Sequence, residues 1–511
     1  MVVSEFVQSI RPLMAKFAID VPDIRIHGLT LDSRNASKHM AFVAVKGHSQ
    51  DGRDYIPQAI ELGTPVVFSQ TEDKITHGKV VTQGNTLVVS LFELPAILSS
   101  IAGAFYDYPA NKLITIGVTG TNGKTSTVNL LSQSKLLLGC RPAAIGTLGS
   151  GVYEGLETSW IATDNANTTP DAINMQYRVA EFVQQGVTHL AYEASSHALV
   201  QNRIAQINTN VAVFTNLSRD HLDYHSDMED YAAAKRSLLN QPGLQAAVIN
   251  IDDPYSADWV RDVTEKQLKG VVIGVGTDIA TISPEFSHCI ASNATYHCDG
   301  CEFTLQSSWG NAVIRSGLMG EFNLYNLLST LGVLLVQGER FDDVVAMIPK
   351  LKPVPGRMEV FEFRNRANIV IDYAHTPDAL DKALLALSQH GQTKPWCIFG
   401  CGGDRDKGKR PEMAKVAQAH SSNIVVTTDN SRTEAPEEIE QHIRQGFTHP
   451  DIGVSKPSRK EAIQYCLDKA SEGDLILLAG KGHETYQIID NNYINYDERA
   501  YVMQLQKELA Q

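Results

Sequence analysis

The sequence predicts an α/β protein built of three domains. Strand-like apolar segments alternate with helical segments along most of the 511 residues, as parallel sheets require. A glycine-rich loop at 120–126 lies between a strand-like run and a helix, and a prior of roughly 150 residues per domain suggests about three domains. We expect an N-terminal α/β domain over 1–95, a central phosphate-loop domain with a mainly parallel sheet over 96–350, and a C-terminal Rossmann-like domain over 351–511.

The composition argues against several classes of protein. The chain has 44 Lys and Arg against 58 Asp and Glu, and its net charge of −14 disfavours nonspecific binding to nucleic acid or an anionic membrane. Seven widely spaced cysteines fit a reducing compartment. Residues 1–14 do not resemble a signal peptide, and no apolar run reaches the roughly 18 residues that span a bilayer. We expect a cytoplasmic protein without membrane insertion.

Strands and one helix are expected in the first domain. Apolar and β-branched residues fill 24–31, 40–45, 64–68 and 86–89. Residues 94–105 follow a helical pattern with a proline in the first turn, where proline is tolerated. We expect this helix to join the first domain to the second.

The central domain is expected to alternate strands and helices. Its strands are predicted at 114–118, 189–193, 211–215 and 246–250. The pattern changes to short polar strands over 280–318, around a Cys-Asp-Gly-Cys turn at 298–301. This turn suggests either a hairpin or, with His288 and His297 nearby, a zinc site. Asp-Gly between strand-like runs is typical of a hairpin, and no second cysteine pair follows, so a hairpin is favoured.

The last domain is predicted to be doubly wound. Residues 353–357, with two prolines and a glycine, are typical of a hinge. Strands are expected after it at 369–372, 396–400, 423–427 and 475–479, separated by helical stretches.

The loop at 120–126 indicates nucleotide binding. Its glycines let backbone N–H groups converge on phosphate oxygens, next to the positive end of a helix dipole. Lys124 would reach the β- and γ-phosphates, and the Thr125 hydroxyl would ligate Mg²⁺. The common pattern G-x-x-x-x-G-K-[ST] is missed by one place because Val118 stands where glycine is expected. A chance glycine-rich helix start is the alternative. The ATP-binding residues expected here are Gly120, Thr121, Asn122, Gly123, Lys124, Thr125 and Ser126.

Further polar residues follow neighbouring strands of this domain. Glu193 ends a strand, where an acid could hold a metal or polarise water; alternatively it is an ordinary solvated residue. A cluster of two Asp and two His within 220–225 follows the next strand. Lys235 lies in an alanine-rich helical stretch, and a solvated helix lysine is the alternative for it. We expect these groups at the carboxyl edge of the sheet, where ligands bind in open α/β folds.

Three strand-end loops of the last domain combine glycine with charge. Residues 400–410 carry several cations, which suits an anionic ligand. Residues 428–434 mix both signs, which suits a zwitterion such as an amino acid, and 480–484 follow a third strand. We expect the three loops to converge on one edge of a parallel sheet.

The order of these motifs resembles the Mur ligase family over essentially the whole chain. The motifs that carry the resemblance are GTNGKTS (120–126), NTTPD (167–171), YEASSHAL (192–199), NLSRDHLDYH (216–225), AAAK (232–235), GEFNLYN (320–326), VPGRME (354–359), DYAHTPDAL (372–380), GCGGDRDKGKRPEM (400–413), DNSRTE (429–434) and GKGHE (480–484). Several of them are not shared with unrelated phosphate-loop proteins.

The resemblance implies an ATP-dependent amide ligase of peptidoglycan precursor synthesis, acting as a monomer. ATP would phosphorylate the D-Glu carboxylate of UDP-N-acetylmuramoyl-L-Ala-D-Glu. The amine of a diamino acid would then attack the acyl phosphate, giving a peptide bond, ADP and phosphate. Crowding two anions into one site demands Mg²⁺ and fixed cations.

The resemblance also implies roles for particular residues. Lys235 matches a lysine that the family carbamylates to N6-carboxylysine, which would hold a second Mg²⁺, while Thr125 and Glu193 would hold the first. Lys124 and His221 are the other catalytic candidates. Further nucleotide contacts would come from Asn326, Arg357, Asp372 and His375.

The UDP-sugar would bind the first domain, and the muramyl-peptide the second. The matching residues are Leu31, Ser33, His48, Ser49 and Gln50 for the UDP-sugar, and Asn167, Thr168, Thr169, Ser195, Gln201 and Arg203 for the muramyl-peptide.

The incoming amino acid would bind the last domain. Ser431 is a departure from the family's usual Asp-Asn-Pro-Arg signature, and the missing proline should leave the loop freer. Arg432 offers a planar fork for a distal carboxylate that diaminopimelate has and lysine lacks, so meso-diaminopimelate is favoured. The residues expected at this site are Arg405, Asp429, Asn430, Ser431, Arg432, Gly480 and Glu484.

Several alternatives stay open from sequence alone. An L-lysine-adding homologue is disfavoured by Arg432. Folylpolyglutamate synthetase and the ligase that adds D-Ala-D-Ala are disfavoured by DNSR followed by GKGHE. A nucleotide-binding regulator without ligase activity is disfavoured because Lys124, Glu193 and Lys235 occur together.

Overall fold

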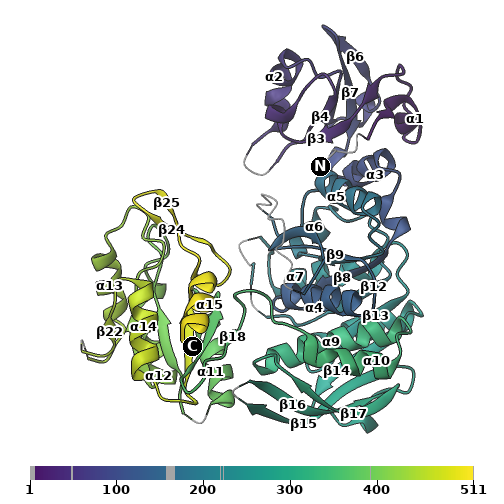
Figure 1. Cartoon of the computed structure of the whole chain (residues 1–511). Coiled ribbons are helices and arrows are strands. Elements are labelled where there is room, and N and C mark those ends of the chain that lie inside the picture. The colour runs from purple at the N-terminus through teal and green to yellow at the C-terminus, as the bar shows by residue number, and fades with distance from the viewer. Residues whose placement is uncertain are drawn as a thin grey trace. The chain divides into compact units, whose positions relative to one another are not determined.

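The computed structural model (Figure 1) describes residues 6–47, 50–156, 167–218, 220–221, 224–297, 299–391, 393–449 and 451–509. The chain divides into two compact units, Met1–Val272 and Ile273–Gln511. The fold is mixed α/β with mainly parallel sheets, as the sequence predicts. Among the described residues, no helix is both long enough and apolar enough to cross a bilayer.

The first sheet of the first unit has the order β3-β4-β5-β7-β6. Its strands are β3 (Gly28–Thr30), β4 (Met40–Ala44), β5 (Val66–Thr71), β6 (Val80–Gln83) and β7 (Thr86–Phe92). All neighbours pair in parallel except β6, which forms an antiparallel hairpin with β7. The sequence did not predict β6, because this edge strand is mostly exposed and lacks an apolar face.

The prediction of a single strand over 24–31 was wrong, because two short strands lie in this segment. β2 (Arg25–Ile26) pairs with β1 (Gln8–Ser9), whereas β3 begins at Gly28 in the main sheet. Gly28 packs closely against the Met40 side chain, which would lie 2.8 Å from a Cβ atom there. Two short helices complete this region, α1 (Ile10–Ala15) and α2 (Ile56–Glu61).

The predicted connecting helix is confirmed as α3 (Leu94–Phe105), with proline in its first turn. Its buried residues Leu98 and Ile101 share one core with Ile173 and Ala180 of α5 (Ala172–Gln184). Burial of this apolar face links the first sheet to the next layer of the unit.

The phosphate-loop sheet of the first unit has the order β10-β9-β11-β8-β12-β13. Its strands are β8 (Ile114–Thr119), β9 (Pro142–Gly146), β10 (Gly149–Val152), β11 (His189–Glu193), β12 (Val211–Phe214) and β13 (Ala246–Asn250). Only β10 pairs antiparallel among them. The accompanying helices are α4 (Lys124–Leu137), α6 (Ser196–Val200), α7 (Met228–Arg236) and α8 (Ser256–Glu265). The carboxyl ends of β8, β11 and β12 therefore meet at one edge.

The division between the units falls inside β14 (Lys269–Val275). In the second unit, β15 (Ser287–His297), β16 (Gly300–Ser307) and β17 (Gly310–Ser316) form an antiparallel meander. The predicted hairpin is thus confirmed, while Cys298 lies outside the described residues. Two helices follow, α9 (Glu321–Val336) and α10 (Phe341–Met347).

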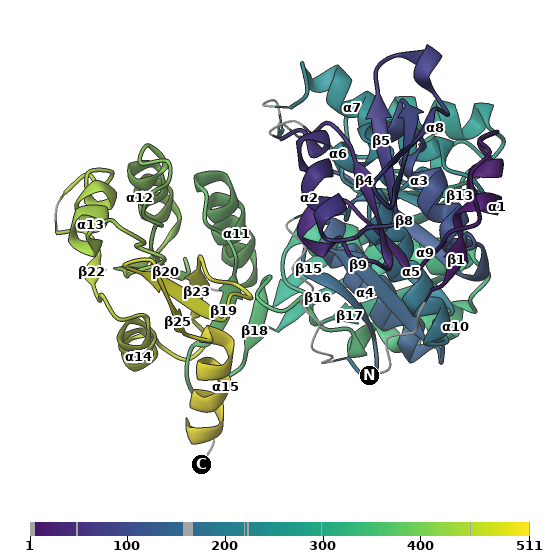
Figure 2. The same ribbon diagram turned by 90° about the horizontal axis from the view of Figure 1, so that it is seen from above.

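The last sheet has the order β18-β19-β23-β20-β21-β22. These strands are β18 (Glu359–Phe361), β19 (Asn368–Asp372), β20 (Trp396–Phe399), β21 (Asn423–Val426), β22 (Val454–Ser455) and β23 (Leu475–Ala479). The helices are α11 (Pro377–His390), α12 (Lys409–His420), α13 (Pro436–Arg444), α14 (Arg459–Lys469) and α15 (Glu498–Leu509). Figure 2 shows α11, α12 and α13 on one face and α14 and α15 on the other, with a core on each face. The doubly wound prediction is confirmed. A hairpin, β24 (Tyr486–Ile489) and β25 (Asn492–Asn495), follows β23.

A buried ion pair ties α14 to the last helix. Arg459 Nη2 donates to Glu498 Oε2 at 3.0 Å and to the Ala479 carbonyl at 3.0 Å, and both charged side chains are 0% exposed. The Tyr496 hydroxyl also donates to Glu498, at 2.9 Å. Such a pair is stable only while both charges and their hydrogen bonds remain.

We expect Glu498→Ala to lower the free energy of unfolding of this fold by about 3–5 kcal/mol, because it leaves the Arg459 cation buried and unpaired. Urea-induced unfolding of the intact chain measures the loss. The matched control is Asp378→Ala, whose partner Lys382 is 52% exposed, and there we expect less than about 1 kcal/mol. Equal losses in the two variants would contradict the role of the buried pair.

Candidate active site

The phosphate loop is fixed by its glycines and by the neighbouring strand end. Gly120 and Gly123 have φ of 146° and 85°, which favour glycine. A Cβ atom on Gly120 would overlap the Thr215 hydroxyl. Thr121 N–H donates to the Asn216 carbonyl at 2.8 Å, and α4 begins at Lys124. The strand, turn and helix that the sequence predicts are confirmed.

Two lysines converge on this loop. Lys124 Nζ donates to the carbonyl oxygens of Gly120 at 2.8 Å and Thr121 at 2.9 Å. Lys235 Nζ donates to the same Gly120 oxygen at 2.7 Å, from a side chain that is almost fully buried. Burial, with the Lys124 cation nearby, holds the pKa of Lys235 well below its usual value. The alternative of a solvated helix lysine is wrong.

Glu193 is also buried, 1% exposed, so the alternative of an ordinary solvated carboxylate is wrong. Thr125 Oγ1 donates to its Oε1 atom at 2.9 Å, and the backbone N–H of Thr147 donates to the same atom at 2.8 Å. The Thr147 hydroxyl donates to Oε2 at 3.2 Å. A Cβ atom on Gly146 would overlap this carboxylate. Sequence reasoning missed Thr147, which only the sheet order brings beside Glu193.

His221 lies near the same edge but is half exposed. Its backbone has φ of 53°, and Nε2 lies 3.5 Å from Asp220 Oδ2. Its ring contacts that of His197 edge-on, with centroids 5.0 Å apart. Arg219, Leu222 and Asp223 of the same motif lie outside the described residues. The catalytic role of His221 stays a prediction.

The residues expected to contact the muramyl-peptide form one hydrogen-bonded group. Thr169 Oγ1 donates to the Glu193 carbonyl at 2.7 Å and lies at hydrogen-bond distance, 3.1 Å, from Ser195 Oγ. Arg203 Nη1 donates to the Thr169 carbonyl at 2.9 Å, and its Nε donates to Gln201 Oε1 at 2.9 Å.

The remaining candidates for this substrate are placed less completely. The hydroxyl oxygens of Thr147 and Thr168 lie at hydrogen-bond distance, 3.2 Å apart, and Asn167 is exposed. In the first sheet region, buried Ser33 donates to Gln58 Oε1 at 2.8 Å. Leu31 packs against the adjacent core, and Gln50 is exposed. His48 and Ser49 lie outside the described residues.

The second unit groups three of the four further nucleotide candidates. Asp372 accepts backbone hydrogen bonds from Met358 and Ala374 at 2.9 Å each. Burial raises the pKa of Asp372, and Arg357 opposes this. Arg357 lies over the Tyr373 ring, 4.7 Å from its centroid. The Nδ1 atom of His375 forms a hydrogen bond with the Tyr373 carbonyl oxygen at 2.9 Å. The fourth candidate, Asn326, is buried on α9.

The three glycine-rich loops of the last sheet do converge, as predicted. They follow β20, β21 and β23, which are parallel neighbours or next neighbours. Arg432 Nη1 donates to the Gly403 carbonyl at 2.9 Å, and Asn430 Nδ2 donates to Glu484 Oε2 at 3.1 Å. Gly480 has φ of 114°, and a Cβ atom there would lie 2.8 Å from Asp429 Oδ2. Arg405 is exposed beside this group.

The hairpin β24–β25 braces the Arg432 loop. Arg432, whose φ is 52°, donates its backbone N–H to the Ile488 carbonyl at 3.0 Å and accepts from Asp490 N–H at 2.7 Å. Ser431 is buried, and its carbonyl accepts from Glu434 N–H at 3.0 Å. These hydrogen bonds constrain a loop that lacks the proline usual at 431.

A second brace joins two of the loops. Arg410 is 0% exposed and donates to both oxygens of Glu434, at 2.9 and 3.0 Å. Asp404 N–H donates to the same carboxylate at 2.6 Å. The Arg410 guanidinium holds the pKa of Glu434 at about 2. Sequence reasoning missed this pair, since both residues read as ordinary helix-flanking charges.

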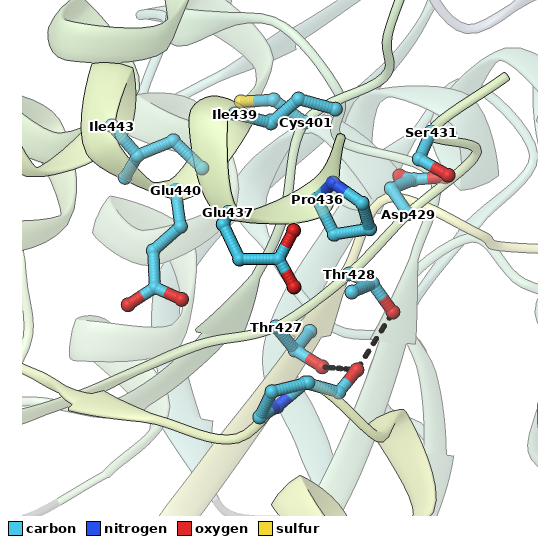
Figure 3. Close-up of a pocket in the computed structure, with 11 residues that line it drawn as sticks. Cys401, Thr427, Thr428, Asp429, Ser431, Pro436, Glu437, Ile439, Glu440 and Ile443 are labelled. Atoms are coloured by element: carbon cyan, nitrogen blue, oxygen red, sulfur yellow. Dashed lines mark hydrogen bonds between the residues drawn. The ribbon is translucent and has the colours of Figure 1, made fainter. Parts of the chain in front are cut away.

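A small pocket lies behind the 428–434 loop (Figure 3). Its walls include Thr427 and Thr428, whose hydroxyls donate to the Pro457 carbonyl at 3.4 and 2.7 Å, and Glu437. Its volume of about 40 Å³ is far below the roughly 300–1,000 Å³ of typical ligand pockets. We therefore interpret this pocket as a packing gap behind the loop and not as a substrate-binding cavity.

Three protein-family models match successive segments of the chain. They are described as "Mur ligase family, catalytic domain" over residues 25–106, "Mur ligase middle domain" over 118–334, and "Mur ligase, glutamate ligase domain" over 356–482.

Similar proteins match nearly the full length. A UDP-N-acetylmuramoyl-L-alanyl-D-glutamate–2,6-diaminopimelate ligase of Haemophilus influenzae is 42% identical, over 95% of this chain and 97% of that protein. A protein of the same name from Vibrio vulnificus is 42% identical over 95% of each chain.

Solved structures agree with this result. A structure of a UDP-N-acetylmuramoyl-L-alanyl-D-glutamate–2,6-diaminopimelate ligase has a TM-score of 0.73 and 31% identity, over 99% of this chain and 100% of that one. A D-alanyl-D-alanyl-adding ligase from Acinetobacter baumannii, with a TM-score of 0.63 and 15% identity over all of both chains, shares the fold. Together with the relatives and the family models, this similarity shows that the chain belongs to the Mur ligase family.

Proposed function

We propose that this protein is an ATP-dependent, ADP-forming carbon–nitrogen ligase that joins meso-diaminopimelate to UDP-N-acetylmuramoyl-L-Ala-D-Glu. The reaction would pass through an acyl phosphate and serve peptidoglycan precursor synthesis in the cytoplasm. The observation that carries the proposal is the convergence of Lys124 and buried Lys235 on the phosphate loop, beside buried Glu193. The names of the similar proteins support the substrate assignment.

We assign the substrates to the three predicted domains. Residues 1–95 would bind the UDP-sugar, 96–350 would bind ATP and the muramyl-peptide, and 351–511 would bind the amino acid and add Arg357, Asp372 and His375 to the nucleotide site. ATP and amino acid sites on different domains imply a closure step, and 353–357 is the hinge that the sequence suggests.

Phosphoryl transfer between two anions requires fixed positive charge. Lys124 would turn from the loop carbonyls to the phosphates, since its present partners are neutral oxygens at 2.8 and 2.9 Å. The Thr125 hydroxyl and the Glu193 carboxylate, 2.9 Å apart, are the oxygen donors that Mg²⁺ prefers. Mg²⁺ bound there would neutralise charge on the transferred phosphoryl group.

Lys235 would supply a further anion as a carbamate. The lowered pKa favours its neutral amine, and only the neutral amine can attack carbon dioxide. The amine nitrogen bonds to the carbon of carbon dioxide, one C=O π bond opens onto its oxygen, and the nitrogen releases one proton to solvent, so that a neutral amine becomes a carbamate anion. The Lys124 cation would then face an anion, and the site would gain an acidic ligand besides Glu193.

The amino acid would be recognised by charge at both ends. Asp429 and Glu484 are carboxylates suited to an ammonium group, and Arg432 has a planar fork suited to a carboxylate. Arg432 is held by Nη1 to the Gly403 and Asn430 carbonyls, at 2.9 and 3.3 Å. Within the part of the chain that the structure describes, no acceptor is bonded to its other guanidinium nitrogens. L-Lysine would leave this fork unpaired, which disfavours the lysine-adding alternative.

The test is phosphate release with ATP, Mg²⁺ and UDP-N-acetylmuramoyl-L-Ala-D-Glu, comparing meso-diaminopimelate with L-lysine. We expect turnover that requires all substrates and strongly prefers diaminopimelate. Equal or better turnover with lysine would reverse the amino acid assignment. No turnover with either amine would contradict the ligase proposal and favour a nucleotide-binding regulator.

Lys235→Ala should reduce turnover at least about a hundredfold, the usual scale for losing a charged group at a transferring phosphoryl. A small carboxylate such as formate should restore part of the activity by filling the space of the carbamate. Lys415→Ala, an exposed lysine on α12, is the control and should leave turnover unchanged. Full activity of Lys235→Ala would remove the carbamate from the mechanism.

Arg432→Ala should raise the KM for diaminopimelate by about tenfold or more, which corresponds to one charge-assisted hydrogen bond. The KM for ATP should stay within about twofold, because the nucleotide is bound elsewhere. Steady-state kinetics with each substrate varied measures both constants. Arg315→Ala, with a side chain 68% exposed on β17, is the control. An equal rise in both KM values would refute the assigned contact.

A further inference from the structure

One buried cation in the three glycine-rich loops of the last sheet, Lys481, has no role in the proposed chemistry. Lys481 follows β23 and its side chain is 0% exposed. Its Nζ atom donates to Glu484 Oε2 at 2.7 Å and to Asn430 Oδ1 at 2.9 Å, and lies 3.7 Å from Asp429 Oδ1. All three neighbours are residues expected to bind the incoming amino acid. A lysine is almost never fully buried unless it is paired.

Lys481 determines which way the Asn430 amide points. Asn430 Oδ1 accepts from Lys481 Nζ and from Ile488 N–H, both at 2.9 Å. Both partners can only donate, so the oxygen of the amide must face them. The amide nitrogen is thereby directed to Glu484 Oε2, to which it donates at 3.1 Å.

Lys481 also fixes the Glu484 carboxylate. Glu484 Oε2 accepts from Lys481 and Asn430, while Oε1 accepts from the Tyr373 hydroxyl at 3.3 Å. The lysine further offsets repulsion between Glu484 and Asp429, two carboxylates close to the same ammonium. Without it, the low-dielectric setting would favour moving one carboxylate away or protonating it.

We propose that Lys481 is a positioning residue for the amino acid site, one that holds the Glu484 carboxylate in place for the ammonium group of a diamino acid and fixes the direction of the Asn430 amide, without itself contacting the substrate. The inference rests on the proposed function. Its mechanism is preorganisation: binding then costs no reorientation of the amide or the carboxylate. Gly480 and Gly482, with φ of 114° and 52°, let the backbone turn so that the lysine between them points inward.

The test compares Lys481→Met, Glu484→Gln and the double variant in the full-length protein. Met keeps the length and apolar stem of lysine but removes the charge. We expect Lys481→Met to raise the KM for diaminopimelate about tenfold, the scale of a charge-assisted hydrogen bond. The KM for ATP should stay within about twofold. Lys415→Met is the matched control and should change neither constant.

The double variant separates positioning from simple loss of stability. If Lys481 acts through the Glu484 carboxylate, the double variant should lose little more kcat/KM than Glu484→Gln alone. If Lys481→Met has a clearly lower melting temperature than the wild-type protein, the double variant is used for the comparison instead, because it does not contain the unpaired charge of Glu484.

The positioning role would be overturned if the losses of kcat/KM in Lys481→Met and Glu484→Gln multiplied in the double variant. It would also be overturned if Lys481→Met raised the KM for ATP as much as the KM for diaminopimelate. The ligase proposal would stand in both cases. A wild-type protein that releases no phosphate with either amine would overturn both.

Discussion

Two lysine side chains meet at one carbonyl oxygen of the phosphate loop, and the central site depends on how repulsion between their charged forms is relieved. Lys124 and Lys235 both donate to the Gly120 carbonyl, at 2.8 and 2.7 Å. Two unit charges about 4 Å apart repel by roughly 4 kcal/mol at an effective dielectric constant near 20. Burial of Lys235 removes the solvent that would screen this term. A neutral or carbamylated Lys235 would relieve this repulsion, and so would a bound phosphate.

Parallel sheets supply the geometry in both units. In the first unit, the carboxyl ends of β8, β11 and β12 gather segments that are far apart in sequence. In the second unit, β20, β21 and β23 do the same for the three glycine-rich loops of the proposed amino acid site. Hydrogen bonds between loops then fix side chains that the strands only bring near, as Lys481 does for Asn430 and Glu484.

Regular elements and strand-end motifs could be predicted from sequence because their signals are local. β11, β13, β23 and α3 have the predicted bounds, since an apolar run or a proline marks each end. The phosphate loop and the convergence of the glycine-rich loops followed from the βα pattern alone.

Other features depend on tertiary contacts, which the local sequence pattern does not predict. The break between β2 and β3, the edge strand β6 and the hairpin that braces Arg432 were not predicted. Thr147 looks ordinary in sequence, and Lys481 lies in the GKGHE motif without an assigned role; the positions of both side chains beside Glu193 and Glu484 come only from the folded structure. Burial likewise decided between the two readings of Lys235 and of Glu193.

The most direct measurement is carbon NMR of the protein equilibrated with isotopically labelled carbon dioxide, with Lys235→Ala as reference. The account predicts a carbamate resonance in the wild-type protein that is absent from the variant and that rises and falls with activity as carbon dioxide is added or removed. A fully active protein without that resonance would contradict it, and would leave a neutral Lys235 amine or a bound phosphate to relieve the repulsion.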